Sequence, residues 1–331
     1  MMKIAIVGFG FMGRMHYGNW KKIRGVKVAA ICDANLARLT ETTKGNLAGI
    51  DETTDFTGIA VYDDFAKMIA AGGFDAVDVT LPTPLHPGMS IAALEAGYHV
   101  LCEKPMALTV AECDKMLAAA KRAKRTLLVA HCLRFWPEYV ALKKLIDSGK
   151  YGKVVAAEFF RASNPPDPKG PHGWFLDDRK SGGCMLDMHI HDADMIAHLF
   201  GAPKNVSAIV HHRRDGVLDH AQLTYAYPDK IVTGTVSWAS SATHGFEASF
   251  RVTLEDATVE FDTKRETPFL VFPQKGKPFT PKVSARNGYE AEQRYFLGLI
   301  DGSADAAFLT ARDARNAVAL VENAQRTKVK A

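Results

Sequence analysis

Three groups of residues in the sequence combine residue types and spacings that suit chemistry at a bound ligand. In the first group, Glu103-Lys104-Pro105 directly follows the apolar run 99–102, which predicts a lysine at the carboxyl end of a strand. Ligands of open α/β sheets bind beyond these strand ends, and a partly desolvated ammonium there can donate a proton or stabilise negative charge. The alternative is a surface lysine that opens the next loop.

The second group is rich in glycine and follows the apolar run 3–7, which predicts a buried strand. It has the spacing G-x-G-x-x-G and consists of Gly8, Phe9, Gly10, Phe11, Met12 and Gly13. The first glycine permits a tight turn, the second lets the backbone approach a pyrophosphate, and the third lets the next helix pack closely on the strand. The amino terminus of that helix would then attract the phosphates through its amides and its dipole.

An acidic residue strengthens this interpretation. Asp33 ends a second apolar run about twenty residues past the glycines, where a carboxylate would bind the adenosine ribose. It would also repel a 2′-phosphate, so NAD is favoured over NADP as the cofactor. Arg38, about one turn into the next predicted helix, could soften this preference. The alternative is a glycine-rich turn in which Asp33 only caps a helix.

The third group joins acids and histidines within the segment 181–194. If the intervening residues are helical, spacings of four, three and four bring four side chains to one helix face: Asp187, His191, Asp194 and His198. His191 is then a candidate acid or base, and Asp187 would orient or tune it from one turn earlier. Met188, Ile196 and Leu199 would pack on the opposite side.

Two other interpretations of the third group are open. First-row metals accept such ligands, but no H-E-x-x-H pattern is present and we expect no metal. The acids and histidines could instead pair with neighbouring backbone and arginine groups in a purely structural helix.

The elements that must position these groups fall into two halves. Up to about residue 131, apolar runs alternate with helical stretches, which is typical of a parallel, doubly wound sheet. Strands are predicted at 3–7, 26–32, 59–62, 75–81, 98–102 and 126–131. Two helix starts are predicted, one capped by Asp63 or Asp64 and one by Thr109. The polar stretch 44–58 has no clear periodicity, and we assign it no function.

The second half begins after Trp136-Pro137 with a helix predicted near 139–146. It continues with strands predicted at 153–161, 205–213, 219–227, 230–238, 246–254, 257–262 and 268–272. Their short links favour antiparallel pairing. One hairpin is polar on one parity (Gln222, Thr224, Thr233, Thr235, Ser237) and apolar on the other (Leu223, Tyr225, Val232, Val236, Trp238). The polar face is either solvated or a subunit interface. The chain is predicted to be helical again over about 290–328.

Composition limits the class of protein. A chain of 331 residues suggests about two domains, and a formal charge of +4 with no long basic tract argues against nucleic acid as a partner. No apolar run of about eighteen residues and no signal peptide are present, so we expect a cytoplasmic protein with no membrane partner. Five cysteines without C-x-x-C spacing indicate reduced, mostly buried thiols.

Taken together, these motifs resemble the Gfo/Idh/MocA family, named for glucose-fructose oxidoreductase, inositol dehydrogenase and rhizopine catabolism, over nearly the whole chain. The specific matches are Glu103-Lys104-Pro105 and Gly182-Gly183 followed by Asp187-x-x-x-His191. The resemblance implies an α/β protein with a Rossmann domain over 1–125 and an α+β domain over 126–331 for substrate binding and oligomerisation. That second domain would contain a large, mainly antiparallel open sheet, and its C-terminal helix could pack back on the first domain.

The resemblance also implies site residues. Lys104, Asp187 and His191 would be catalytic, and Lys104-Pro105 could be a cis peptide, which proline tolerates. The cofactor site would include Glu103 and a nicotinamide-side loop containing Leu81, Pro82, Thr83 and His86. By residue type, candidates for the substrate pocket are Arg134, Arg161, His172, Trp174 and His189. The alternatives are that Arg161 is a surface residue at a strand end and that Trp174 packs. Cys184 stands where the family has a third glycine, and His189 stands where relatives often have a small residue.

The implied reaction is hydride transfer between NAD(P) and a secondary hydroxyl or keto group of a sugar, cyclitol or related polyol. Lys104 would stabilise charge and His191 would take the proton. One alternative is oxidation followed by elimination with retained NAD, and another is a regulatory protein that binds NAD without turnover. Besides the small-molecule substrate, the expected partner is the chain itself, as a homodimer or homotetramer through the C-terminal sheet.

Overall fold

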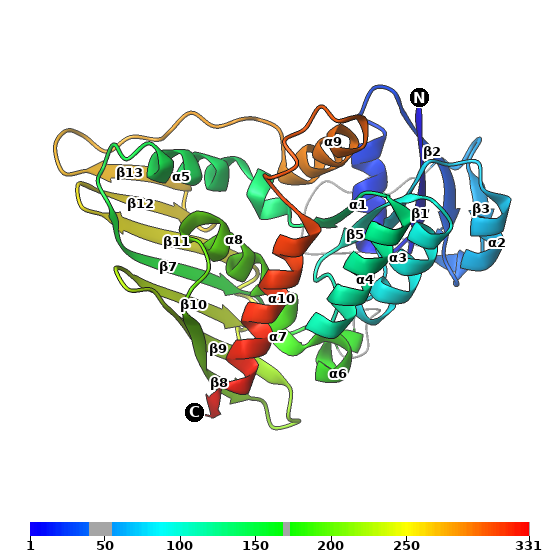
Figure 1. The fold of residues 1–331 in the computed structure, drawn as a ribbon. Helices are drawn as coiled ribbons and strands as arrows, with labels where there is room; N and C mark the ends of the chain where they lie inside the picture. The colour runs from blue at the N-terminus through cyan, green and yellow to red at the C-terminus, as the bar shows by residue number, and fades with distance from the viewer. Residues whose placement is uncertain (40–54, 168–172, 331) are drawn as a thin grey trace. The chain divides into compact units, whose positions relative to one another are not determined.

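The structure is a computed structural model that describes residues 1–39, 55–167 and 173–330 (Figure 1). Two compact units divide the chain, one made of Met1–Cys132 with Gly288–Arg315 and the other of Leu133–Asn287 with Asn316–Ala331. The first unit thus extends beyond residue 125, where the sequence placed a boundary. His172, residues 44–54 of the polar stretch and the side chain of Arg38 lie outside the described part.

The first unit is built on a six-stranded parallel sheet with the order β3-β2-β1-β4-β5-β6. The strands are β1 Met2–Val7, β2 Val26–Cys32, β3 Ala60–Tyr62, β4 Ala76–Val79, β5 His99–Glu103 and β6 Leu127–Ala130. Each predicted strand is confirmed to within about two residues. The strand order is that of a Rossmann fold, and it reverses between β1 and β4, where open α/β sheets bind ligands.

Helices cover this sheet, which is why its strands are continuous apolar runs: all residues of β4 and of β6 are buried. The helices of this unit are α1 Phe11–Trp20, η1 Leu36–Leu39, α2 Phe65–Ala71, η2 Thr83–Leu85, α3 His86–Glu95, α4 Val110–Ala123 and α9 Gly288–Asp301. The predicted caps form: Asp64 accepts from Lys67 N at 2.8 Å, and Thr109 forms a capping box with Glu112. The unit thus includes α9 from a distant part of the sequence.

The second unit contains an eight-stranded sheet with the order β13-β12-β11-β7-β10-β9-β8-β14. Its strands are β7 Val154–Ala162, β8 Asn205–His212, β9 Leu218–Ala226, β10 Ile231–Ser237, β11 Glu247–Leu254, β12 Ala257–Asp262, β13 Phe269–Pro273 and β14 Val329–Lys330. The pairs β7–β10 and β8–β14 are parallel, and the other five pairs are antiparallel. A mainly antiparallel sheet is therefore confirmed.

One face of this sheet is covered by α5 Pro137–Asp147, α7 Gly183–Asp187 and α8 Ile190–Phe200 (Figure 1). The predicted hairpin alternation is confirmed, because Leu223 and Tyr225 are buried whereas Gln222 and Thr224 are exposed. Ser237 is the exception on the polar parity and is buried. The remaining helices are η3 Cys132–Phe135, η4 Gly173–Leu176, α6 Asp178–Ser181 and α10 Ala311–Arg326, the last of which spans both units.

One expectation about this unit is wrong: the acids and histidines do not lie on a single helix. The chain forms α7 and α8 with Met188 and His189 between them, and the amides of both residues donate to Cys184 O. The break lets the His189 ring enter the core, where Nε2 lies 2.7 Å from the hydroxyl oxygen of Tyr225. Asp187 therefore ends one helix, whereas His191 belongs to the next.

The five cysteines are all buried, as predicted, and no disulfide joins any of them in the described part of the chain. Burial raises the pKa of Cys32 to about 11, so this thiol stays protonated at neutral pH. Among the described residues, no helix has the length and apolar character needed to cross a bilayer.

Candidate functional site

The glycine turn between β1 and α1 shows what each glycine does. Gly8 has a φ of +88°, and an added Cβ would lie 2.8 Å from Thr80 O. A Cβ on Gly13 would lie 2.1 Å from Gly8 O. Both contacts are too close, so these two positions must be glycine for the turn and the helix to pack. Among the described residues, no other atom lies within 4 Å of a Cβ built on Gly10, which leaves room for a ligand at the turn.

The amino terminus of α1 is suited to an anion. Gly10 is its N-cap, no side chain caps it, and no acidic residue lies in its first turn. The helix end therefore presents its positive dipole without a competing carboxylate. Phe9 and Phe11 are buried and anchor the turn, while Met12 is partly exposed.

Asp33 lies directly beside this turn. Its Oδ2 accepts a hydrogen bond of 2.8 Å from Phe9 N, and its Oδ1 accepts one of 2.9 Å from Asn35 N. The carboxylate is thereby fixed at the end of β2, where the ribose of a dinucleotide would lie. The open space at Gly10, the helix end and Asp33 together fit a bound dinucleotide.

Lys104 follows β5 at the same edge of the sheet and is partly exposed. The Lys104-Pro105 peptide is cis, as the resemblance implied. Glu103 Oε2 accepts a hydrogen bond of 2.9 Å from Lys104 N, so the buried Glu103 side chain holds the backbone at the lysine.

The loops after β4 and β5 are joined by His86. Its Nε2 lies 2.7 Å from Leu81 O, and its Nδ1 lies 2.8 Å from Pro105 O. Leu81 and Pro82 remain partly exposed, whereas Thr83 is buried. These contacts bring the expected nicotinamide-side loop next to the loop that carries Lys104.

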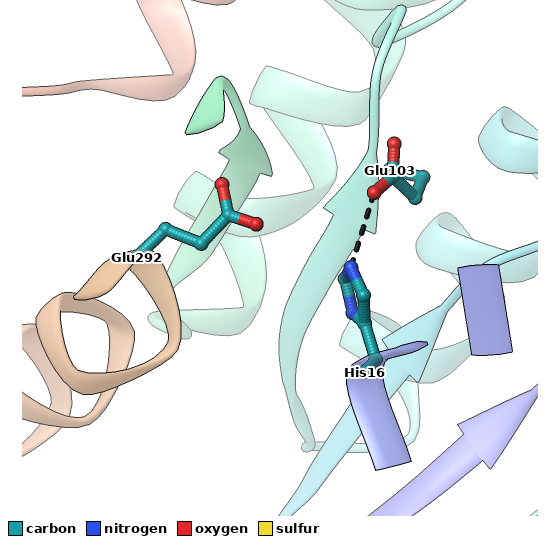
Figure 2. A group of neighbouring side chains, drawn as sticks. All are labelled: His16, Glu103 and Glu292. Atoms are coloured by element: carbon teal, nitrogen blue, oxygen red, sulfur yellow. Dashed lines mark hydrogen bonds and ion pairs between the residues drawn. The ribbon is translucent and has the colours of Figure 1, made fainter. Parts of the chain in front are cut away.

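A buried ionic cluster that the sequence interpretation missed lies beneath these loops and consists of His16, Asp78, Glu103 and Glu292 (Figure 2 shows three of them). His16 Nδ1 lies 2.9 Å from Asp78 Oδ2, and its Nε2 lies 3.1 Å from Glu103 Oε1. Trp20 Nε1 donates to Asp78 at 2.6 Å. His16 stands three residues after Gly13, a spacing that could have flagged it. Glu292 comes from α9 and gave no local signal.

The charges within this cluster are strongly coupled. Burial alone would lower the pKa of His16, but Asp78 and Glu103 outweigh it and raise that pKa well above its usual value. Burial acts the other way on Glu103, yet His16 and Lys104 lower its pKa overall. Burial raises the pKa of Glu292 well above its usual value, because His16 offsets the cost only in part. These shifts favour an imidazolium at His16, a carboxylate at Glu103 and a protonated carboxyl group at Glu292.

In the second unit, the α7–α8 segment presents two side chains. From Gly183 to Ile196 every residue is buried except Asp187 and His191, which are partly exposed. Asp187 ends α7 and His191 lies in the first turn of α8. Asp187 and His191, which lie on either side of the break between the helices, are thus an accessible acid and an accessible imidazole among buried neighbours.

Most other candidate side chains of this unit have buried partners. Arg134 contacts Asp194 through two hydrogen bonds of 2.8 and 2.7 Å, and Arg161 contacts Asp192 through two of 3.0 and 2.8 Å. Arg161 is therefore buried rather than a surface residue, and aspartates of α8 bind both guanidiniums. Burial opposes the charge on Arg161, but Asp192 outweighs it and raises the pKa of that guanidinium.

His189 and Trp174 differ in exposure. His189 is fully buried, and a Cβ added to Gly234 would lie 2.4 Å from its Cε1. Burial lowers the pKa of His189 to about 4, so the ring is neutral, and we assign it a packing role against β9 and β10. Trp174 stacks on Phe175 with ring centroids 4.0 Å apart and is partly exposed. Trp174 therefore stays a candidate for substrate contact.

Comparison with known proteins agrees with this geometry. Residues 2–131 match the model of the oxidoreductase family with an NAD-binding Rossmann fold, and residues 139–260 match the GFO/IDH/MocA C-terminal domain. The myo-inositol 2-dehydrogenase of Thermotoga maritima is 28% identical over 282 residues, which are 83% of this chain and 79% of that protein. The D-apiose dehydrogenase of Paraburkholderia graminis is 34% identical over 207 residues, 62% of this chain and 52% of that one.

A solved structure has the same fold. The aldose-aldose oxidoreductase of Caulobacter crescentus, complexed with glycerol, superposes with a TM-score of 0.83 at 24% identity, covering 98% of this chain and 97% of that one. The glycine turn that fits a dinucleotide and the two sheets are features expected from these matches. The chain belongs to the Gfo/Idh/MocA family and is an NAD(P)-dependent dehydrogenase that acts on CH–OH groups.

Proposed function

We propose that this protein transfers a hydride reversibly between NAD and a secondary hydroxyl of a sugar, cyclitol or related polyol. The observation that carries the proposal is Lys104 at the carboxyl end of β5, on the same sheet edge as the turn that fits a dinucleotide. The names of the relatives, which include myo-inositol and D-apiose dehydrogenases, support this class of substrate.

Three side chains divide the chemistry in this proposal. The nicotinamide, when bound, supplies the hydride acceptor. Lys104 stabilises the negative charge that develops on the substrate oxygen, and His191 takes the hydroxyl proton. Asp187 orients the imidazole and balances its charge. The partial exposure of Asp187 and His191 within a buried segment supports their roles.

Asp33 selects the cofactor in this proposal. Its carboxylate lies beside the glycine turn, held by Phe9 N, and would accept hydrogen bonds from the ribose hydroxyls. A 2′-phosphate at that position would meet a negative charge, so the protein uses NAD in preference to NADP.

The test follows nicotinamide reduction by the purified protein, with NAD and NADP in parallel, across polyols, cyclitols, aldoses and uronates. We expect Lys104→Ala to lower turnover by about 100-fold to 10,000-fold, with little change in NAD affinity. Lys115→Ala, at an exposed position on α4, is the matched control and should behave as wild type. Unchanged turnover in Lys104→Ala would defeat the assignment.

The substrate panel also separates the two rival functions. Turnover without added NAD, together with cofactor that copurifies, would point to oxidation followed by elimination. NAD binding without reduction across the whole panel would point to a regulatory protein.

We propose in addition that the uncovered face of the eight-stranded sheet pairs with a second copy of the chain. Ile209 and Ile231 are 54% and 68% exposed on that face, which also carries the exposed Thr224 and the partly exposed Thr233 and Thr235. Light scattering coupled to size exclusion should give a dimer or tetramer, and Ile231→Lys should shift it towards monomer.

A further inference from the structure

Glu292 is a buried acid that the proposed reaction does not use. It lies on α9 with 0% exposure, and neither carboxyl oxygen has a hydrogen-bond partner among the described residues. One oxygen of Glu292, one ring nitrogen of His16 and one oxygen of Glu103 all lie within 4.8 Å of one another. Figure 2 shows its carboxyl group pointing towards the hydrogen-bonded pair of His16 and Glu103. A polar group aimed at this pair calls for a role.

The hydrogen bonds of the cluster divide its three acids into two kinds. Asp78 accepts from His16 and Trp20, and Glu103 accepts from His16 and from Lys104 N. Both carboxylates therefore have donors that stabilise a negative charge. Glu292 has none, so its buried carboxyl group is stable only with a proton.

We propose that Glu292 is a positioning residue that, as a neutral carboxylic acid, preserves the His16–Glu103 contact and thereby the backbone at Lys104. The link runs from α9 to His16 on α1, then to Glu103 on β5, whose second oxygen binds Lys104 N. A negative charge on Glu292 would repel Glu103 and compete for the imidazolium of His16. The effect on turnover rests on the function proposed above for Lys104.

Several titratable groups face this acid from the elements packed around it. They are His16 on α1, Asp78 on β4, Glu103 at the end of β5 and Tyr289 on α9, while Lys104 acts on Glu103 and Cys132 acts on Tyr289. Burial raises the pKa of Glu292. The negative charges of Glu103 and Asp78 raise it further, whereas the positive charge of His16 lowers it. The positive charge of His16 is already shared between Asp78 and Glu103, so it does not ionise Glu292.

A divalent cation is the competing occupant, because one imidazole and two carboxylates can ligate a metal. One divalent ion would supply the same charge as the two protons on His16 and Glu292. Both ring nitrogens of His16 are, however, within hydrogen-bond distance of carboxylates, at 2.9 and 3.1 Å. The ring donates from both nitrogens and has no lone pair for a metal, which favours the protons.

The experiment compares Glu292→Gln with Glu292→Leu in the full-length enzyme with saturating NAD. Glutamine keeps the size and neutrality of the acid, so we expect turnover within about twofold of wild type. Leucine replaces the polar group aimed at the buried His16–Glu103 pair with an apolar one, and we expect a loss of about 10-fold to 100-fold in kcat with a smaller change in KM. Glu290→Gln is the control on the same helix, where Glu290 pairs with Arg294, and it should match wild type.

The pH profile and two measurements without turnover separate positioning from simple stability. The kcat of the wild type should fall at alkaline pH as Glu292 ionises, and this fall should be absent in Glu292→Gln. The infrared carbonyl band of a protonated carboxylic acid should be present in wild type and absent in Glu292→Gln. The amide resonance of Lys104 should move in Glu292→Leu and stay in place in Glu292→Gln.

Two outcomes would overturn the proposal. Equal loss of turnover in both variants, or an unmoved Lys104 resonance in Glu292→Leu, would mean that the neutral acid does not position the loop. About one divalent metal per purified chain, lost in Glu292→Gln, would assign the cluster to a cation. If wild type reduces no NAD with any substrate, the proposed function fails, while the infrared band and the Lys104 resonance still decide the role of Glu292.

Discussion

The two units bury charge in opposite ways. In the second unit Arg161 meets Asp192 and Arg134 meets Asp194, so each carboxylate has its own guanidinium with two hydrogen bonds. In the first unit one imidazole contacts two acids, Asp78 and Glu103, while a third acid on α9 has no hydrogen-bond partner among the described residues and a raised pKa.

This difference decides what each network can do. A guanidinium does not titrate in the range where proteins are folded, and Asp192 outweighs burial to raise the pKa of Arg161 further. Imidazole and carboxyl groups do titrate. Because the second unit pairs its carboxylates with guanidiniums that stay charged, we expect its pairs to respond to pH less than the cluster next to Lys104 does.

The largest expected effect comes from breaking a balanced pair. Asp192→Leu should lower the free energy of unfolding by about 3–5 kcal/mol, because Arg161 would remain buried without its counter-charge. Urea denaturation measures this loss. The double variant Arg161→Met with Asp192→Leu removes both charges and should lose less than the single variant. A double variant as unstable as the single would contradict the view that the stranded charge is what costs stability.

A pH series tests whether the first-unit cluster is responsive. The folded-state pKa of Glu292 is raised, so the wild-type acid must stay protonated in the fold while it ionises in the unfolded chain above a pH of about 4.5. Wild-type stability then falls as pH rises from that value to the folded pKa. Glu292→Gln lacks this fall, so its advantage should grow by up to about 1.4 kcal/mol per pH unit.

His16 acts in the same direction over a higher range. Its folded-state pKa is raised, so its stabilisation is complete below about pH 6.5 and is lost as pH rises through the folded value. The stability difference between Asp192→Leu and wild type, by contrast, should be flat across the same series. If the stability difference between Glu292→Gln and wild type does not change with pH, the two units do not differ in their response to pH.

A smaller effect is expected where the second unit packs a neutral ring. Gly234→Ala would place a Cβ 2.4 Å from His189 Cε1, and overpacking of this kind costs about 1–3 kcal/mol. Gly88→Ala, in α3 with open space around the position, is the control and should be neutral or slightly stabilising. Thermal unfolding distinguishes the two, and equal melting temperatures would show that the His189 ring can move aside.

The smallest effect is expected from an ion pair in solvent. Arg122 and Glu95 are 2.9 Å apart, a distance close to that in the Arg161–Asp192 pair, but their side chains are 63% and 55% exposed. Arg122→Ala should change stability by no more than about 0.5 kcal/mol, and less at high salt. A change as large as that of Asp192→Leu would mean that burial is not what separates these pairs.

Local patterns made most of the fold predictable. The strands of both sheets follow apolar runs and alternation, and Asp64 and Thr109 cap the helices where the sequence suggested. The glycine turn was also accessible, because its motif is contiguous, whereas the cis Lys104-Pro105 peptide was expected only from the family resemblance.

Features that depend on distant contacts were not predictable. The break between α7 and α8 goes with the hydrogen bond between His189 and Tyr225, which is 36 residues away, so helical spacing alone predicted one helix. Glu292 approaches His16 only because α9 returns to the first unit, where Gln293 also donates to His16 O across 277 residues. The buried partners of Arg134 and Arg161 likewise come from α8 rather than from nearby sequence.

Substitutions of the three glycines in the β1–α1 turn should affect a cell in different ways. Gly8 and Gly13 are bounded by the chain itself, so any side chain there should reduce the amount of folded protein. No described residue approaches the Cβ position of Gly10, so alanine there should leave abundance intact and remove only what a dinucleotide contributes. A mutational scan that measured abundance and growth separately would therefore split one motif into two classes, and Gly10→Ala would be a stable, cofactor-blind form of the protein for use as a genetic control.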